Sequence, residues 1–119
     1  MKGQRLFVRP IEAGDADAVR AFAAQYGGSA EPRSGLLGKL VGELVSVLTM
    51  EIEDEAVRVV EIIVAEELRR KRVGRVMLNE LAALATTMRR EWLVADVANR
   101  SFLERVGFVE DGGLMRRRV

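Results

Sequence analysis

The stretch of residues 57–88 changes in character midway, and this change restricts the folds open to the chain. Residues 57–64 are mostly β-branched, which predicts a strand buried on both faces. From Val73 on, apolar residues recur every three or four positions, as they do on one face of a helix. The basic run Arg69–Arg72 lies between these parts. The sequence therefore predicts a strand, a cationic loop and a helix in succession.

A basic loop at the start of a helix suits the binding of an anion. The first N–H groups of a helix have no partner within it, and the helix dipole adds positive potential there. Basic side chains at the same place strengthen the attraction for a phosphate. The alternative is a solvated basic turn before an ordinary core helix, and the local pattern leaves both interpretations open.

The loop residues resemble the acetyl-CoA loop of the GNAT N-acetyltransferases, which reads Gln or Arg, two residues, Gly, one residue, then Gly or Ala. Arg69 and Gly74 fit the first and last positions, whereas Arg72 stands where the family has its first glycine. A glycine at that position lets the backbone approach a pyrophosphate closely, because it has no side chain. The resemblance implies that acetyl-CoA is the co-substrate, with its pyrophosphate on the loop and its pantetheine along the preceding strand. The residues implied in this binding are Ile62, Ile63, Val64, Arg69, Arg70, Lys71, Arg72, Val73, Gly74, Arg75 and Val76.

Two further segments resemble the same family, in family order. Residues 99–108 are similar to its late helix, which ends in Gly-Phe, and residues 6–15 are similar to its first strand and helix start. The resemblance implies that Asn99 and Phe102 lie on the cofactor side, although Asn99 also suits a helix cap. It also implies a single α/β domain over residues 1–119, with a mixed, mostly antiparallel sheet, a splayed parallel pair and flanking helices.

Before the central unit, the sequence predicts a helix and a long strand. Pro10 stops a first strand, Asp15 is a good N-cap for the helix that follows, and Gly27 ends that helix. Residues 36–44 have helical spacing, but two glycines would weaken a helix there. We therefore expect a strand that begins near Leu40, continues to about residue 52 and turns back into the central strand.

After the central helix, the sequence predicts a strand, a short helix and a hairpin. Trp92–Val97 is apolar and would lie parallel to the central strand through a crossover connection. The turn at residues 111–113 then predicts a terminal hairpin. An antiparallel hairpin followed by a strand–helix–strand unit makes a mixed sheet.

The composition limits the chemistry. The 119 residues suit one domain, and they include no cysteine and no histidine, which excludes disulfides, thiolate nucleophiles, histidine-based triads and nearly every zinc site. A net charge of +1 argues against a general nucleic-acid binder. No apolar run approaches the roughly 20 residues of a membrane span, and the first residues lack the apolar segment of a secretory signal. We expect a cytoplasmic protein with no membrane partner.

Two carboxylates are candidates for the general base that would take a proton from an amine. Glu61 lies in the apolar central strand, on the face of Val59 and Ile63 by strict alternation. An unpaired carboxylate there would have a raised pKa. Asp96, in the parallel neighbour, is open to the same argument. The alternative for each is an arginine partner or solvent.

The general acid is missing from its expected position. The family places a tyrosine four residues before the glycine of Gly-Phe, and Leu103 stands there in this chain. Tyr26, the sole tyrosine, matches no catalytic position of the family. Water would then have to protonate the leaving thiolate.

The resemblance implies acetyl transfer to a small amine or amino acid by direct attack, and the candidate bases for it are Glu61 and Asp96. A non-catalytic CoA-binding or regulatory module is the alternative, and an arginine-rich RNA or anion binder is a third. The segment between the first helix and the next strand is short, so the acceptor site would be open or completed by a second subunit in a homodimer.

Overall fold

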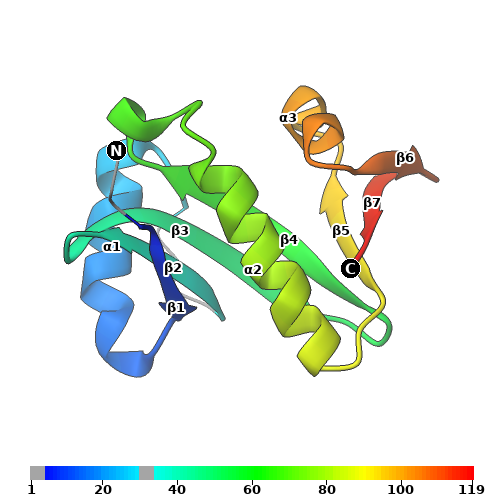
Figure 1. The fold of residues 1–119 in the computed structure, drawn as a ribbon, viewed down its shortest axis with the longest axis horizontal. Coiled ribbons are helices and arrows are strands. Elements are labelled where there is room, and N and C mark those ends of the chain that lie inside the picture. The colour runs from blue at the N-terminus through cyan, green and yellow to red at the C-terminus, as the bar shows by residue number, and fades with distance from the viewer. Residues whose placement is uncertain (1–4, 30–33) are drawn as a thin grey trace.

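The computed structural model describes residues 5–29 and 34–119, which fold around one seven-stranded sheet (Figure 1). The strand order is β1-β2-β3-β4-β5-β7-β6, and neighbouring strands are antiparallel except for β4 and β5. The strands are β1 Phe7–Pro10, β2 Gly35–Leu40, β3 Glu43–Ile52, β4 Ala56–Val64, β5 Trp92–Asp96, β6 Val109–Asp111 and β7 Leu114–Arg118. The helices are α1 Ala16–Tyr26, α2 Val73–Thr87 and α3 Arg100–Arg105, with 3-10 turns η1 Ala13–Asp15 and η2 Glu66–Leu68. The predicted mixed, mostly antiparallel sheet with one parallel pair is confirmed.

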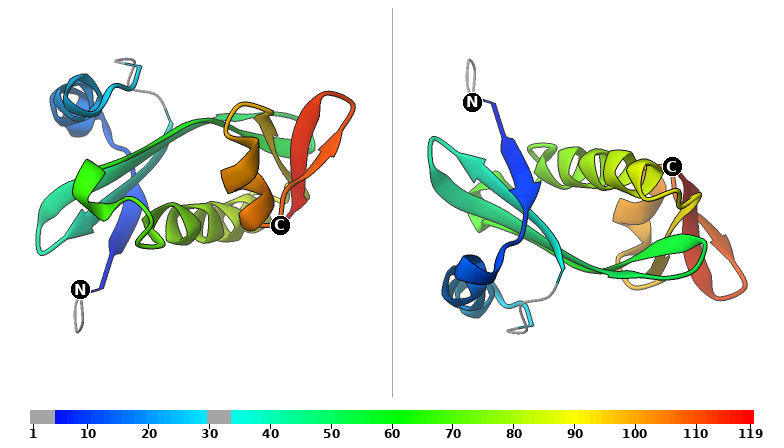
Figure 2. Two further views of the ribbon diagram at one scale, coloured as in Figure 1. Left: turned by 90° about the horizontal axis from the view of Figure 1, so that it is seen from above. Right: turned by 90° about the horizontal axis from the view of Figure 1, so that it is seen from below.

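Helices cover both faces of the sheet. Helix α1 packs on one face, where Val19, Phe22 and Ala23 meet Val47 and Ile63. Helices α2 and α3 lie on the other face, as the two views in Figure 2 show. The core on that side includes Leu48, Val57, Val59, Met77, Leu78, Leu81 and Leu103. None of the helices in the described ranges is both long and apolar enough to cross a membrane.

Strands β4 and β5 pair over a short distance and then separate. Ala56, Val57 and Arg58 lie opposite residues 92–94, and no pairing continues beyond Arg58 (Figure 1). From Val59 on, the edge of β4 that faces β5 therefore has no strand partner within the described residues. This separation opens the sheet in its middle.

A β-bulge at Val60 changes which way the side chains of β4 point. Thr49 lies opposite Glu61 and Met50 lies opposite Val59, so Val60 is an extra residue in β4. Val59 consequently packs in the core under α2, whereas Ile63 packs in the core under α1. Glu61 shares a face with Ile63 and not with Val59, and Val60 is 40% exposed. The expectations of strict alternation and of burial on both faces are thus wrong from the bulge onward.

The structure has two strands and a turn where the sequence predicted one strand that begins near Leu40. Leu40 ends β2, and Val41 and Gly42, with φ of 50° and 78°, form a two-residue turn into β3. Two successive positive φ values are typical of the hairpin turn that Asn-Gly favours. Val-Gly is not a typical sequence for this turn, so the sequence did not predict β2 as a separate strand.

Asp15 does precede α1, but its carboxylate does not cap that helix. It accepts hydrogen bonds from both Nη atoms of Arg9 at 2.8 Å and from the backbone N–H of Glu12 at 2.7 Å. These bonds hold the pKa of Asp15 well below its usual range. The bond from Arg9 has the largest effect on the pKa, and the bond from the Glu12 N–H has the next largest. Asp15 therefore joins β1 to the start of α1.

Candidate functional site

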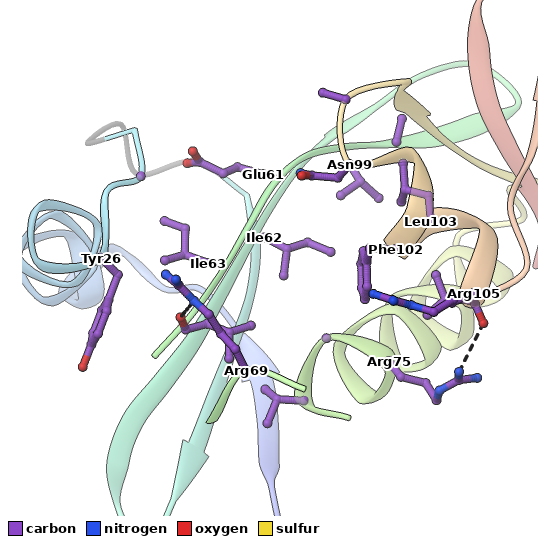
Figure 3. Close-up of a pocket in the computed structure, with 18 of the residues that line it drawn as sticks. Tyr26, Glu61, Ile62, Ile63, Arg69, Arg75, Asn99, Phe102, Leu103 and Arg105 are labelled. Atoms are coloured by element: carbon purple, nitrogen blue, oxygen red, sulfur yellow. Dashed lines mark hydrogen bonds between the residues drawn. The ribbon is translucent and has the colours of Figure 1, made fainter. Parts of the chain in front are cut away.

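A cleft of about 830 Å³ opens where β4 and β5 separate (Figure 3). Both strands, the loop before α2, the end of α1 and helix α3 form its walls. The sequence-predicted residues that line it are Glu61, Ile62, Ile63, Val64, Arg69, Arg70, Arg72, Val73, Gly74, Arg75, Asp96, Asn99 and Phe102. Lys71 and Val76 belong to the same predicted set and lie outside the lining. Residues far apart in the sequence thus meet around one space.

The loop before α2 has a backbone that glycine would adopt easily. Arg70 and Arg72 have φ of 67° and 66°, in the left-handed region, which costs a residue with a side chain about 1 kcal/mol. Arg72 directly precedes α2, and its carbonyl accepts the first intrahelical bond, from Val76 N–H at 3.0 Å. The N–H groups of residues 73–75 come before that bond and have no partner within the helix, and these three residues line the cleft. The loop therefore keeps a glycine-like conformation although Arg72 replaces the glycine.

Gly74 allows α2 to approach α3 closely. A Cβ atom at Gly74 would lie 2.9 Å from Cζ of Phe102, which is closer than such contacts allow. Arg75 supports the same contact, because its Nη2 donates to the carbonyl oxygen of Arg105 at 3.1 Å (Figure 3). The start of α2 and the end of α3 are therefore joined beside the cleft.

The unpaired edge of β4 faces the cleft near the same loop. Nε of Arg69 donates to the carbonyl oxygen of Val64 at 3.2 Å (Figure 3). This carbonyl is a backbone acceptor that no neighbouring strand of the described residues uses. An extended ligand with amide groups could pair with this edge as a strand would.

Glu61 is not the unpaired carboxylate that the sequence suggested. Its Oε1 and Oε2 accept hydrogen bonds from the backbone N–H of Ser29 at 2.9 and 3.0 Å. Gly28 lies against the same strand, since a Cβ there would be 2.1 Å from Cδ1 of Ile63. Glu61 therefore holds the chain after α1 against β4 and still lines the cleft.

Asp96 lies at the open end of β5. Its side chain is 84% exposed, and Oδ1 is 3.6 Å from Nη1 of Arg58. Arg58 bonds more closely to Oε2 of Glu53, at 2.7 Å. The arginine partner that sequence reasoning left open is thus present, and Asp96 is a weakly held, solvated carboxylate.

Leu103, which stands at the position of the missing tyrosine, and Asn99 both border the cleft. Leu103 is 4% exposed, is part of the core under α2 and α3, and also borders the cleft. Asn99 directly precedes α3 with φ of 63°, makes no side-chain capping bond, and lies at the cleft (Figure 3). The alternative role of Asn99 as a side-chain cap is therefore not seen.

Sequence reasoning missed Tyr26, Gly28, Val60 and Arg105 as cleft residues. Tyr26 is at the last turn of α1, on the same side of β4 as Glu61 (Figure 3). No local signal places the end of α1 beside β4, because that contact depends on how the helix packs. Val60 was missed because the sequence does not reveal the bulge.

The comparisons with known proteins agree with this arrangement. Residues 5–108 match the acetyltransferase (GNAT) family model, and the chain belongs to this family. Ard1 from Thermoplasma volcanium is a solved structure of similar fold, with 17% identity, a TM-score of 0.77, and 96% of this chain and 97% of that chain covered. The family resemblance read from the three sequence segments is confirmed.

Two further solved structures share the fold. The ribosomal-protein-S18-alanine N-acetyltransferase from Escherichia coli has 14% identity and a TM-score of 0.80, over 97% of this chain and 94% of that chain. A GNAT family acetyltransferase from Elizabethkingia anophelis, solved with acetyl-CoA bound, has 17% identity and a TM-score of 0.69, over 96% and 98%. No curated protein sequence matches the chain.

Proposed function

We propose that this chain is an acetyl-CoA-dependent N-acetyltransferase that acts on a small amine or amino acid. The observation that carries the proposal is the cleft at the separation of β4 and β5, with the basic loop and the start of α2 on its wall. The N–H groups of residues 73–75 and the loop arginines suit the pyrophosphate of the donor. The open edge of β4 at residues 62–64 suits its pantetheine amides.

The reaction requires no enzyme nucleophile. The amine nitrogen of the acceptor bonds to the thioester carbonyl carbon, the C–S bond breaks, and the amine loses a proton while the thiolate gains one. Glu61 is our preferred base because it lines the cleft in a fixed position, whereas Asp96 is solvated. Leu103 offers no proton, so water would supply one to the thiolate.

For the experiments below, we name the two sides of the cleft. The donor side is the loop and helix start at residues 69–75 with the β4 edge at residues 62–64. The acceptor side is the segment Tyr26–Ser29 with Glu61. All residues of both sides line the same cleft, with the exception of Lys71 and Ser29.

The test is calorimetric titration with acetyl-CoA and CoA. Gly74→Asp places a carboxylate at the start of α2 and against Phe102, where it would repel an anionic ligand, so we expect a loss of affinity of about 100-fold. Gly14→Asp is the matched control, since nothing lies within 4 Å of a Cβ there and it adds the same charge. Acetyl transfer to a panel of amines and amino acids is then measured. Failure of the wild type to bind either ligand would refute the proposal.

A non-catalytic CoA-binding module is the second candidate, and Leu103 favours it. A buried leucine cannot serve as the general acid. Binding of acetyl-CoA without transfer to any amine of the panel would support this candidate. Unchanged turnover in both Glu61→Gln and Asp96→Asn would instead leave an active enzyme and remove both candidate bases.

A further inference from the structure

Arg69 begins the loop on the donor side, but its side chain points toward the acceptor side. Its Nε donates to the carbonyl oxygen of Val64 at 3.2 Å, at the end of the open edge of β4. From there the guanidinium leans toward the side of β4 that carries Ile63 and Glu61, and away from the start of α2 at Arg75 (Figure 3). The bond to Val64 thus places a cation beside the acceptor side of the cleft.

The outer nitrogens of Arg69 can still bind a ligand. The bond to Val64 uses only Nε, and no carboxylate of the described residues forms an ion pair with Arg69. The side chain is exposed and lines the cleft. A guanidinium has five N–H donors in a planar fork, and two of them can bind both oxygens of a carboxylate. Arg69 is therefore placed to bind a carboxylate that enters the cleft.

Glu61 supplies the opposite charge on the same side of β4. Its carboxylate accepts from the N–H of Ser29, and a Cβ at Gly28 would lie 3.3 Å from its Oε1 and 2.1 Å from Cδ1 of Ile63. The carboxylate and the end of Ile63 are therefore neighbours. The side chain of Tyr26 also lies on this side of β4 (Figure 3). The acceptor side thus combines an anion, a cation and apolar surface.

The spacing of the two charged groups suits a free amino acid. Glu61 and Val64 are three positions apart in β4, which corresponds to roughly 10 Å along a strand. An amino acid that forms one hydrogen bond at its amine and another at its carboxylate spans about 9 Å, from one protein atom to the other. An amine without a carboxylate would meet only Glu61.

We propose that the acceptor is an amino acid with a free α-carboxylate, which Arg69 binds while Glu61 receives the amine. This inference rests on the proposed function and narrows its acceptor class. The acyl transfer itself is unchanged: the N–C bond forms, the C–S bond breaks, the amine loses its proton to Glu61, and water protonates the thiolate. The carboxylate of the acceptor takes no part in these steps, so Arg69 acts in substrate recognition.

The test compares amino acids with the amines that lack their carboxylate, for example leucine with isopentylamine and phenylalanine with phenethylamine. For the best amino acid of a panel that covers the standard side chains, we expect kcat/KM to exceed that of its matched amine at least about tenfold. Arg69→Gln should raise the KM for the amino acid about tenfold. It should leave kcat/KM for the amine and the Kd for CoA within a factor of two.

Two further variants act as controls. Arg69→Lys keeps the positive charge and should restore part of the preference for the amino acid, because an ammonium still attracts a carboxylate but cannot bind it as a fork. Arg89→Gln removes an exposed arginine in the turn after α2, outside the cleft lining. It should leave the preference and the Kd for CoA unchanged, which separates a contact from an effect of net charge.

The outcomes separate this inference from the proposed function. Equal kcat/KM of the wild type for every amino acid and its matched amine would overturn the inference and leave the proposed function standing. Weaker CoA binding by Arg69→Gln with an unchanged preference would also overturn it, because Arg69 would then bind the donor. Failure of the wild type to transfer acetyl to any member of the panel would overturn both.

Discussion

The two parts of the donor side of the cleft, residues 62–64 and 69–75, are close together in the chain, whereas the acceptor side joins segments that are far apart in it. Residues 69–75 form one loop and the first turn of one helix, and their positions follow from that local structure. On the acceptor side, Ser29 meets Glu61, which is 32 residues away. Local structure therefore positions the residues that we propose to bind phosphate, whereas the positions of the proposed acceptor side depend on how α1 packs against β4.

The largest expected effect tests whether the acceptor side holds the base. In Glu61→Gln, the remaining amide oxygen can still accept from Ser29 N–H, so the segment stays in place while the base is lost. We expect turnover to fall by about 100-fold or more, with the Kd for CoA unchanged, because a general base contributes that much. Steady-state kinetics and calorimetry measure the two effects. Asp96→Asn is the control, and a larger loss of turnover there would exchange the two assignments.

A substitution at Gly28 tests the packing of the acceptor side. Gly28→Ala would push a Cβ to within 2.1 Å of Ile63 Cδ1, so the segment or the isoleucine must move. We expect a loss of about 1–2 kcal/mol in the free energy of unfolding and a higher KM for the acceptor, with CoA binding retained. Gly14→Ala, where nothing lies within 4 Å, is the matched control in urea unfolding. A loss of CoA affinity together with the higher KM for the acceptor would show that the two sides are coupled.

A pH series tests how α1, which carries the acceptor side, is attached. The folded-state pKa of Asp15 is lowered, chiefly by its hydrogen bond with Arg9. Asp15 therefore stabilises the fold above its unfolded pKa of about 4, and this stabilisation is lost as the pH falls through the lower folded value. In urea unfolding between pH 6 and pH 2, we expect Asp15→Asn to have a flatter decline in stability than the wild type. Parallel curves would mean that Asp15 contributes nothing to this decline.

The smallest effect concerns the core between the sheet and α2, where Ser46 and Met77 both lie beside Gly38. The hydroxyl of Ser46 is fully buried in β3 and has no hydrogen-bond partner among the described residues. We expect Ser46→Ala to leave stability unchanged or to raise it by up to about 1 kcal/mol, because an unsatisfied polar group is removed. Thermal unfolding measures this. A clear loss of stability would mean that the hydroxyl has a water partner.

Regular elements with a strong local pattern were predictable. The helix from Val73 follows from the spacing of its apolar residues, and the central strand follows from its β-branched residues. The turn at Val41 and Gly42 was not predictable, because its sequence lacks the usual Asn-Gly signal. The bulge at Val60 was also missed, since strict alternation is a property of regular strands and a bulge is stabilised by its neighbours.

The sequence by itself determined the family, the order of its main elements and the basic loop, because periodicity and motif spacing are local properties. Only the tertiary structure decided that Glu61 faces α1, that Ser29 binds it, and that Tyr26 reaches the cleft. The physical reason is that these contacts join residues from different elements. Their positions depend on the bulge in β4 and on the packing of α1, which no pattern within a single element encodes.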